Sequence, residues 1–267
     1  MTATIITITS GKGGVGKTTT TANVALALAE QGDKVVCIDG DIGLRNLDVV
    51  MGLENRIVYD LVDVIEGRCR LKQAMIRDKR MNELYLIPAA QTRDKSAVTP
   101  SDMVRLGDQL RDEFDWVLID SPAGIERGFR NSIAPADMVL VVTNPEVSAV
   151  RDADRIIGLV EAEEKGPAKL VINRLNIDLV KRGDMLTAED VVELLAIDLV
   201  GIVPEDESVV VSTNRGQPVV MEANTTAGQA FRNIGLRLKG QEVPYLDLDA
   251  KKGFFHSLSN MLRSGGD

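Results

Sequence analysis

The sequence predicts an α/β fold, a single doubly wound and mostly parallel sheet with helices on both faces. Two observations predict it. Short β-branched segments alternate with longer amphipathic segments along the 267 residues, which is the pattern of parallel βαβ units. Aspartate or asparagine directly follows several of the β-branched segments, at the place where the carboxyl ends of parallel strands line a ligand-binding crevice.

The expected elements begin with residues 4–9, a β-branched run that suits a buried strand. After a glycine-rich turn, residues 18–30 suit a helix, which Gly32 would end as its C-cap. Residues 34–38 form the second expected strand, and residues 59–65 have a short helical pattern. A strand–turn–helix unit is therefore expected to open the chain.

The middle of the chain continues this alternation. Residues 84–87 suit a strand that Pro88 ends, and residues 102–114 space their apolar side chains as an amphipathic helix does. Residues 116–119 and 138–143 are hydrophobic runs of strand length. Two further strands are therefore expected after the helix.

The last third of the domain follows the same pattern. Residues 148–164 suit a helix and residues 170–172 a short strand. Thr187 and Asp190 are spaced as a capping box, which opens a further helix, and residues 199–203 are the last clear strand.

A single domain is expected over residues 1–238, followed by a separate tail over residues 239–267. The sequence shows no internal repeat, low-complexity tract or linker that would divide the body. A length of 267 residues is also consistent with one large α/β domain.

Composition disfavours several classes of protein. Lysine and arginine number 31 against 40 acidic residues, and the formal net charge of −9 disfavours a nucleic-acid-binding surface. No apolar run approaches the ~20 residues of a membrane-spanning helix, and the start lacks the basic segment of a signal peptide. Cys37 and Cys69 lack metal-binding spacing, which favours a reducing cytosol.

The glycine-rich turn carries the strongest functional signal. It reads GKGGVGKT and satisfies the phosphate-binding pattern G-x-x-x-x-G-K-[ST]. Glycines let consecutive N–H groups point at phosphate oxygens, and the following helix adds the positive end of its dipole. Lys17 would reach the β- and γ-phosphates, and Thr18 would ligate Mg²⁺. The expected phosphate-binding residues are Gly11, Lys12, Gly13, Gly14, Val15, Gly16, Lys17, Thr18 and Thr19.

Three carboxylates follow strands that are expected to neighbour this turn. Asp39 and Asp41 follow the second strand, and Asp120 follows residues 116–119. Each alone would also suit an ordinary turn, but together they favour a site for Mg²⁺ and water. Asp120 would hold Mg²⁺ through water, and Asp41 would orient the attacking water. The expected metal ligands are Thr18, Asp39 and Asp120.

Within the turn, the letters KGGVGKT resemble the deviant Walker A motif of the ParA/MinD family of ATPases. The resemblance implies ATP hydrolysis and a homodimer that sandwiches the nucleotide, with Lys12 crossing to the partner's phosphates. Residues 39–48, 120–126, 143–155 and 201–206 are similar to the septum-positioning branch of that family, so the resemblance covers almost the whole chain. The implied catalytic residues are Lys12, Lys17, Asp41 and Asp120.

The base of the nucleotide is expected to be adenine. Residues 173–176 read NRLN and lack the aspartate that binds the guanine edge in GTP-specific proteins. The resemblance implies that the adenine contacts come from two loops, although ordinary loop roles fit these residues equally. They are Asn173, Pro204, Glu205 and Asp206. ATP and Mg²⁺ are therefore the expected cofactors.

The resemblance also implies partners. In the septum-positioning branch, the ATP-bound dimer recruits the division inhibitor MinC to the inner face of the cell membrane, and MinE stimulates hydrolysis. The protein would cycle between the cytoplasm and anionic membrane lipids, with no nucleic-acid partner. The implied partner surface comprises Asn46, Glu146, Ser148 and Asp152.

The end of the chain has an amphipathic pattern at about residues 251–263. At 100° per residue, five apolar side chains occupy an arc of about 120°, and Lys252, His256 and Arg263 lie opposite. Such a stripe could pack against the body of the protein, but its phenylalanines and its terminal position favour insertion at a membrane interface. The expected membrane-binding residues are Phe254, Phe255, Leu258, Met261 and Leu262.

Three alternatives stay open. A flagellar-number-type regulatory ATPase of the same family shares the fold and a membrane-targeting tail. A soluble metabolic P-loop enzyme, which would phosphorylate a small carboxylate, gives the amphipathic tail no purpose. A non-catalytic scaffold would bind nucleotide without steady release of ADP.

Overall fold

The computed structural model describes residues 2–248 of the chain. Within them, one sheet has the strand order β3-β4-β2-β5-β1-β6-β7-β8 and is parallel except for the β3–β4 pair. The strands are β1 (Thr4–Thr9), β2 (Val35–Asp39), β3 (Ile76–Arg77), β4 (Leu84–Ile87), β5 (Trp116–Asp120), β6 (Met138–Thr143), β7 (Ala168–Leu175) and β8 (Asp198–Pro204). The predicted α/β class with a mostly parallel sheet is confirmed.

The predicted tail helix at about residues 251–263 lies outside the described residues, and so do its five apolar side chains. Among residues 2–248, no helix combines the length and the apolar content needed to cross a bilayer.

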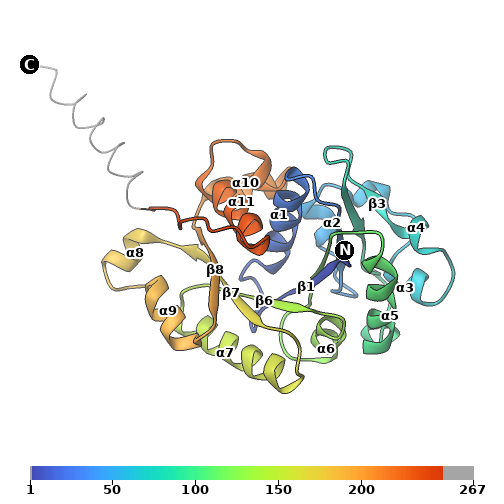
Figure 1. The fold of residues 1–267 in the computed structure, drawn as a ribbon, viewed down its shortest axis with the longest axis horizontal. Coiled ribbons are helices and arrows are strands. Elements are labelled where there is room, and N and C mark those ends of the chain that lie inside the picture. The colour runs from blue at the N-terminus through green and yellow to red at the C-terminus, as the bar shows by residue number, and fades with distance from the viewer. Residues whose placement is uncertain (1, 249–267) are drawn as a thin grey trace, which may run out of the picture.

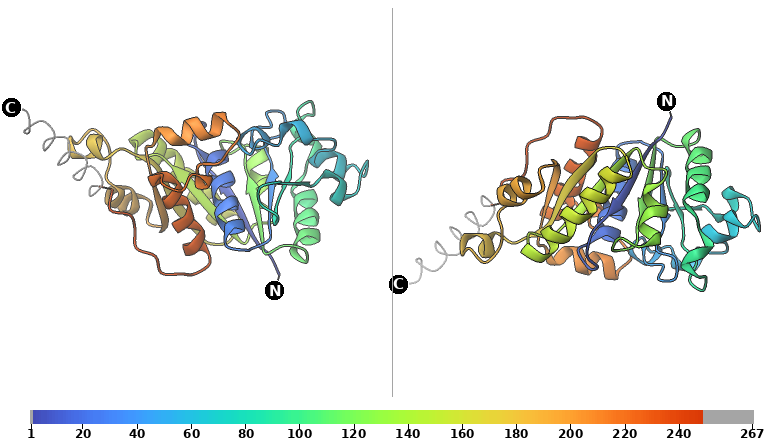
Figure 2. Two further views of the ribbon diagram at one scale, coloured as in Figure 1. Left: turned by 90° about the horizontal axis from the view of Figure 1, so that it is seen from above. Right: turned by 90° about the horizontal axis from the view of Figure 1, so that it is seen from below.

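Helices cover both faces of the sheet, as predicted. They are α1 (Lys17–Glu30), α2 (Leu47–Val50), α3 (Leu61–Ile65), α4 (Leu71–Ala74), α5 (Pro100–Arg111), α6 (Arg127–Ile133), α7 (Val147–Ala162), α8 (Ile177–Lys181), α9 (Ala188–Leu195), α10 (Glu207–Asn214) and α11 (Thr226–Leu238). α1 and α11 pack on one face, and α5, α6 and α7 pack on the other (Figure 1). Figure 2 shows the same layers from above and below.

The central strand β1 explains why its sequence is β-branched throughout. It pairs with β5 on one side and β6 on the other, and its last five residues are buried. A strand covered by helices on both faces has no solvent side, so both sets of side chains are apolar or small. The glycine-rich turn therefore leaves the sheet at the middle of its carboxyl edge.

The end of α1 differs by one residue from the predicted C-cap. The cap is Gln31, and Gly32 follows it with a φ of 88°. The Gly32 N–H donates to the Ala29 carbonyl at 3.0 Å, and the Asp33 N–H donates to the Leu28 carbonyl at 3.3 Å. This is a Schellman motif, in which glycine takes the left-handed position one residue beyond the cap.

Several elements were not predicted, namely the edge strand β3 and the helices α2, α4, α6, α8, α10 and α11. α11 belongs to the core, because Phe231 and Ile234 are fully buried. At Gly235 an added Cβ would lie 3.3 Å from the Ala27 Cβ of α1. α11 thus packs closely on α1 and holds the helix that starts at the glycine-rich turn.

Candidate nucleotide site

The glycine-rich turn between β1 and α1 needs glycine for two physical reasons. Gly14 and Gly16 have φ values of 80° and 101°, a region that side chains with a Cβ rarely adopt. At Gly11 an added Cβ would overlap the backbone of Asp152 in α7, and at Gly16 it would overlap the Asn173 amide. The turn therefore contains residues in the left-handed conformation and packs closely against α7 on one side and β7 on the other.

Asn173 ties the turn to the neighbouring strand β7. Its Nδ2 donates a hydrogen bond to the Val15 carbonyl at 2.7 Å, and the side chain is buried. The sequence assigned Asn173 to the adenine base. The structure places its amide against the turn, so it positions the phosphate-binding backbone whatever else it contacts.

A cavity of about 630 Å³ opens beside the turn. It is lined by Gly16, Thr19, Asn173, Arg174, Pro204, Glu205, Asp206, Glu207, Val209 and Val210. The four candidate adenine contacts are thus brought together next to the end of the phosphate-binding turn. The sequence missed the lining residues Arg174, Glu207, Val209 and Val210. The only available signal was the position of Arg174 directly after Asn173, since the others lie on the unpredicted helix α10.

Lys17, at the start of α1, lies within the site rather than in solvent. Only 8% of its surface is exposed. Burial lowers the pKa of its ammonium group, and the carboxylates of Asp120 and Asp41 act in the opposite direction. The three predicted residues Lys17, Asp41 and Asp120 therefore lie near enough to interact electrostatically, as a phosphate and Mg²⁺ site requires.

Asp39 and Asp120 end adjacent strands and pair in register. Asp120 is buried, and its carboxylate accepts hydrogen bonds from the Thr18 side chain and from Thr21 Oγ1, the latter at 3.3 Å. Burial, together with the charge of Asp39, raises the pKa of Asp120 to about 8. Burial also raises the pKa of Asp39 to about 6. Two carboxylates are thus held side by side with little solvent to stabilise their charge.

The Asp39 carboxylate organises the loop that follows β2. It accepts hydrogen bonds from the backbone N–H groups of Asp41 at 3.0 Å, Asn46 at 3.2 Å and Leu47 at 3.2 Å. The sequence proposed Asp39 as a metal ligand, and the structure gives both of its oxygens backbone donors. This assigns Asp39 a role in positioning Asp41 and the start of α2.

The donor set at the site fits Mg²⁺. Mg²⁺ prefers hard oxygen ligands and is usually held by one or two carboxylates together with substrate phosphates and water. The Thr18 hydroxyl and the Asp120 carboxylate supply such oxygens next to the phosphate-binding turn. A divalent cation would also favour the charged form of Asp120, which burial disfavours. Among residues 2–248 there is no cluster of three or more histidine, cysteine or acidic side chains that would hold a metal by itself.

The raised pKa of Asp120 predicts a pH dependence of stability for the nucleotide-free protein. Its pKa rises from 3.8 to about 8 on folding, so the folded protein holds a proton that the unfolded chain has lost. The free energy of unfolding should therefore fall as the pH rises from about 4 to about 8. We expect Asp120→Asn to reduce this fall by more than half, because asparagine does not titrate.

Urea denaturation of the nucleotide-free protein at pH 5.5 and pH 8 measures this effect. Asp112→Asn is the matched control, because Asp112 is exposed at the end of α5. An equal loss of stability between the two pH values in the wild type and in Asp120→Asn would contradict the assignment.

The candidate partner surface lies on the first turns of α7, beside the phosphate-binding turn. Glu146 and Ser148 are exposed and Asp152 is partly buried. Lys12 Nζ lies 3.8 Å from Glu146 Oε2, and each side chain is about half exposed, at 48% and 52%. Asn46 is also exposed, at the N-cap of α2. Lys12, expected to act across a dimer interface, therefore lies at an exposed edge of the site.

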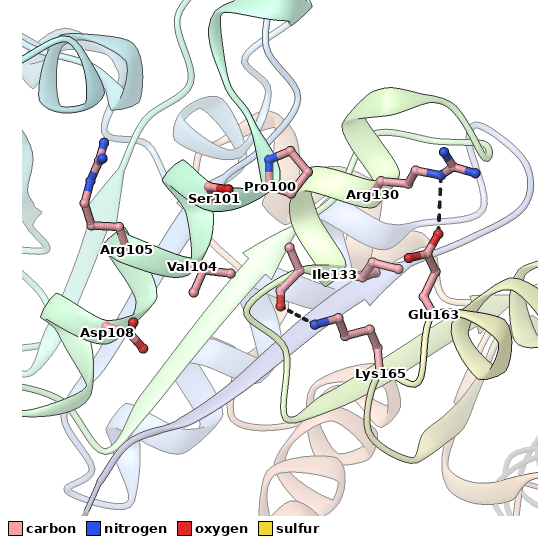
Figure 3. A pocket seen from close by; sticks show the side chains of 10 residues that line it. Pro100, Ser101, Val104, Arg105, Asp108, Arg130, Ile133, Glu163 and Lys165 are labelled. Atoms are coloured by element: carbon pink, nitrogen blue, oxygen red, sulfur yellow. Dashed lines mark hydrogen bonds and ion pairs between the residues drawn. The ribbon is translucent and has the colours of Figure 1, made fainter.

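A different cavity, of about 590 Å³, lies between α5, α6 and the end of α7 (Figure 3). Arg130 pairs with Glu163 at 3.5 Å across it, and Lys165 Nζ donates to the Ala134 carbonyl at 2.8 Å. Its lining contains none of the sequence candidates and shares no residue with the cavity beside the phosphate-binding turn. The nucleotide candidate is therefore the cavity at Gly16.

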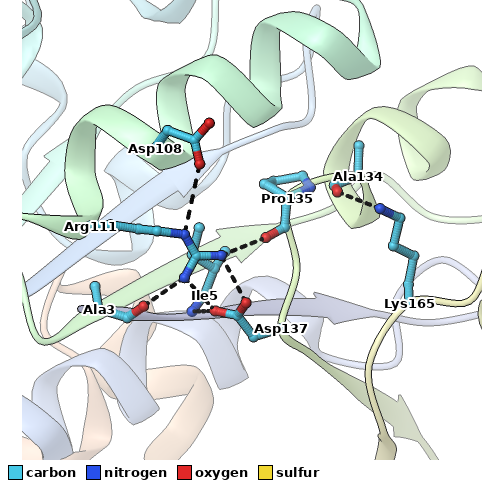
Figure 4. Close-up of polar contacts among 8 residues, drawn as sticks. All are labelled: Ala3, Ile5, Asp108, Arg111, Ala134, Pro135, Asp137 and Lys165. Atoms are coloured by element: carbon cyan, nitrogen blue, oxygen red, sulfur yellow. Dashed lines mark hydrogen bonds and ion pairs between the residues drawn. The ribbon is translucent and has the colours of Figure 1, made fainter. Parts of the chain in front are cut away.

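Polar contacts next to the α5–α6 cavity hold the amino-terminal end of β1, opposite the end that carries the phosphate-binding turn (Figure 4). Both terminal nitrogens of Arg111 donate to the Asp137 carboxylate at 2.7 Å, and Nη1 also donates to the Ala3 carbonyl at 2.8 Å. Asp137 in turn accepts from the Ile5 N–H at 2.8 Å. These contacts fix the start of β1 relative to β6, so the site at the other end of β1 has a rigid base.

Comparison with known proteins identifies the family. The CobQ/CobB/MinD/ParA nucleotide binding domain matches residues 6–219. The septum site-determining protein MinD of Bacillus subtilis is 56% identical over 241 residues, with 90% of each chain covered.

Solved structures agree with this sequence match. In the MinC:MinD cell division protein complex of Aquifex aeolicus, a chain superposes with a TM-score of 0.85 and 48% identity, covering 91% of this chain and 98% of that one. The septum site-determining protein MinD of Pyrococcus horikoshii, complexed with Mg-ADP, superposes with a TM-score of 0.80 and 29% identity, covering 88% and 96%. The chain therefore belongs to the MinD septum site-determining proteins, within the CobQ/CobB/MinD/ParA nucleotide-binding family of P-loop NTPases.

Proposed function

We propose that the protein is an ATPase that dimerises with ATP, associates with the membrane and places the division septum by recruiting the division inhibitor MinC. The observation that carries this proposal is the group formed by the buried Lys17 and Asp120 and the partly buried Asp41 at the carboxyl edge of the sheet, in a chain of the MinD family. A phosphate-binding turn alone would support only nucleotide binding.

Each residue of the site has a proposed task. The N–H groups of residues 11–18 and the Lys17 ammonium bind the phosphates, while Thr18 and Asp120 hold Mg²⁺, which balances the phosphate charge when bound. Asp41 orients the attacking water. The Asp39 carboxylate accepts a hydrogen bond from the Asp41 N–H at 3.0 Å and so fixes the backbone of Asp41. Lys12 reaches the phosphates of a second copy.

Adenine is the proposed base. The cavity beside Gly16 is lined by the Asn173 amide and by the loop that contains Pro204, Glu205 and Asp206. Residues 173–176 lack the aspartate that binds the guanine edge in GTP-specific proteins. The Mg-ADP complex of the Pyrococcus relative supports the same choice. ATP and Mg²⁺ are therefore the proposed cofactors.

MinC is the proposed partner of the ATP-bound dimer, and MinE is the proposed activator of hydrolysis. The Aquifex complex contains MinC and MinD. Asn46, Glu146 and Ser148 are exposed. Glu146 pairs with Lys12 of the phosphate-binding turn, and the backbone of Asp152 packs against Gly11, so a partner that binds this surface would contact the edge of the nucleotide site.

The tail is proposed to bind anionic lipids at the inner face of the cell membrane. Burial of one large apolar side chain contributes at most about 1.5–3 kcal/mol, and ordering of the peptide offsets much of it. One tail therefore binds lipid weakly, whereas two tails on one dimer gain about 10²–10⁴-fold in avidity. ATP-dependent dimerisation would thus control membrane binding.

Loss of the apolar stripe should abolish membrane binding and leave hydrolysis intact. We expect Phe254→Glu with Leu258→Glu to reduce binding to anionic vesicles more than tenfold in ATP, because each charge would have to enter the apolar interface. Co-sedimentation with vesicles measures it. His256→Glu with Asn260→Glu adds the same charge on the polar face and should keep most of the binding. Equal loss in both double variants would remove the apolar stripe from the account.

A further inference from the structure

The hairpin between β3 and β4 carries an ion pair that lies outside the nucleotide site. Its carboxylate, Asp78, is buried and accepts hydrogen bonds from Arg80 Nε at 3.0 Å and from Arg80 Nη2 at 2.6 Å. The Arg80 backbone N–H also donates to Asp78, at 2.7 Å. Burial acts to raise the pKa of Asp78, but Arg80 outweighs it and holds this pKa below its usual value. The carboxylate therefore stays charged and holds the guanidinium in one orientation.

Two further hydrogen bonds from Arg80 join segments that are far apart in the sequence. Nη1 donates to the Gly216 carbonyl at 2.8 Å, and Nη2 donates to the Met51 carbonyl. Met51 directly follows α2, and Gly216 lies two residues beyond the end of α10. The planar guanidinium presents its donors in fixed directions, which lets one side chain bond three such acceptors at once. Arg80 thus connects the ends of two helices.

The two helix ends touch through their backbones at this point. Gly52 and Gly216 have φ values of 65° and 62°, in the left-handed region that favours glycine. A Cβ added at Gly52 would lie 2.5 Å from the Gly216 carbonyl oxygen, and one added at Gly216 would lie 2.6 Å from the Gly52 Cα. The close approach requires glycine on both sides. Arg80 therefore fixes the end of α2 against the end of α10.

α2 leads directly to the loop that carries Asp41. At the start of α2, the Asp39 carboxylate accepts hydrogen bonds from the N–H groups of Asn46 and Leu47, and it also accepts one from the Asp41 N–H. α2 has only four residues, about one helical turn. A shift of Met51 would therefore reach the contacts of Asp39, so an anchor at the end of α2 also holds the loop of Asp41.

α10 gives this anchor a fixed support. The Asp206 carboxylate caps α10 by accepting from the Ser208 N–H at 2.9 Å, and it accepts from the Ala227 N–H of α11 at 3.3 Å. These contacts hold the end of α10 that lines the nucleotide cavity, and they are separate from Arg80. Loss of the Arg80 side chain should therefore release α2 and leave the nucleotide cavity in place.

We propose that Arg80 is a positioning residue for ATP hydrolysis, because it holds α2 against α10 and so keeps Asp41 aligned with the attacking water. The proposal rests on the proposed hydrolysis and on the role of Asp41 in it. A displacement of about 1 Å at a reacting group can cost about 10²-fold in rate, whereas the phosphate-binding turn and the base cavity are built from other segments. Substitution of Arg80 therefore slows hydrolysis and leaves nucleotide affinity nearly unchanged.

Single-turnover release of phosphate, compared with ATP affinity in titration calorimetry, tests this role in protein that light scattering shows to be dimeric. Arg80→Gln should hydrolyse ATP at least about tenfold more slowly, with an affinity within about threefold of the wild type. Arg77→Gln is the matched control, because Arg77 Nε donates within the same hairpin, to the Asn82 carbonyl at 2.7 Å, and it should keep the wild-type rate. A wild-type rate in Arg80→Gln, or an equal loss of rate and affinity, would overturn the proposal.

Arg80→Lys separates the geometry of the guanidinium from its charge and from the stability of the fold. Lysine keeps a cation beside Asp78, but its single ammonium cannot replace donors that point in three directions. We expect this variant to fold with a urea midpoint close to that of the wild type and still to hydrolyse ATP at least about threefold more slowly. Full activity of Arg80→Lys would show that only the charge matters and would contradict the positioning role.

A double-mutant cycle asks whether Arg80 acts through Asp41. If it does, Arg80→Gln in an Asp41→Ala background should change the rate by less than about twofold, because the aligned group is already gone. A further loss as large as in the wild type would refute the positioning role. Slow hydrolysis by Asp41→Ala with a wild-type rate in Arg80→Gln would overturn this proposal alone, whereas no hydrolysis by the wild type would contradict the proposed function itself.

Discussion

Lys17→Ala is expected to lower nucleotide affinity by more than 100-fold and to abolish ATP-dependent dimerisation. The Lys17 ammonium is buried and lies within the fields of Asp120 and Asp41. Removing one partner from a buried charged site costs about 2–5 kcal/mol, since the remaining charges stay unbalanced. Phosphate groups would then meet two carboxylates without the cation that offsets them.

Titration calorimetry with ATP and Mg²⁺ measures the affinity, and light scattering after gel filtration measures the dimer. Lys72→Ala is the matched control, because Lys72 is 73% exposed and pairs with Glu113 at the surface, at 3.2 Å. Normal dimerisation of Lys17→Ala with ATP would refute the assignment of the phosphate site.

Asp41→Ala is expected to keep ATP-dependent dimerisation and to lower the rate of hydrolysis by about 10²–10⁴-fold, the contribution typical of a positioned general base. Asp41 follows β2, and Asp39 fixes its backbone N–H. The substitution leaves the phosphate-binding turn, Lys17 and Asp120 in place, so binding should persist while water is no longer oriented.

Release of inorganic phosphate under single-turnover conditions separates hydrolysis from binding. Asp112→Ala removes an exposed aspartate at the end of α5 and should hydrolyse ATP at the wild-type rate. Wild-type turnover by Asp41→Ala would remove Asp41 from the reaction.

The sequence was informative where the signal is local. The segment from β1 through the glycine-rich turn to α1 was predicted within one residue, because each part has its own local cause: a β-branched run, glycines and a helix end at Gly32. The capping box of Thr187 and Asp190 is confirmed for the same reason, with the Asp190 N–H donating to Thr187 Oγ1 at 3.0 Å.

Two of the missed helices form against the propensity of their own residues. α10 contains three consecutive valines, 209–211, which favour a strand by propensity. It is a helix in the structure, and Asp206 caps it by accepting from the Ser208 N–H at 2.9 Å. α11 contains Gly228 and Gly235, which weaken a helix in isolation. Its packing on α1 outweighs that loss.

In the candidate site, too, the local signals were predictable and the contacts between distant segments were not. The identity of its residues follows from the motif, but their partners do not. No pattern showed that Asn173 would bind the Val15 carbonyl, or that both oxygens of Asp39 would accept backbone N–H groups. Both contacts join segments that only the folded sheet brings together.

Vesicle sedimentation with anionic lipids tests the central claim most directly, namely that nucleotide state controls membrane binding through the tail. The full chain and a variant that ends at Ala250 are compared in ATP and in ADP. We predict that only the full chain in ATP pellets with the vesicles. Equal pelleting in ATP and ADP, or pelleting of the variant that ends at Ala250, would contradict the account.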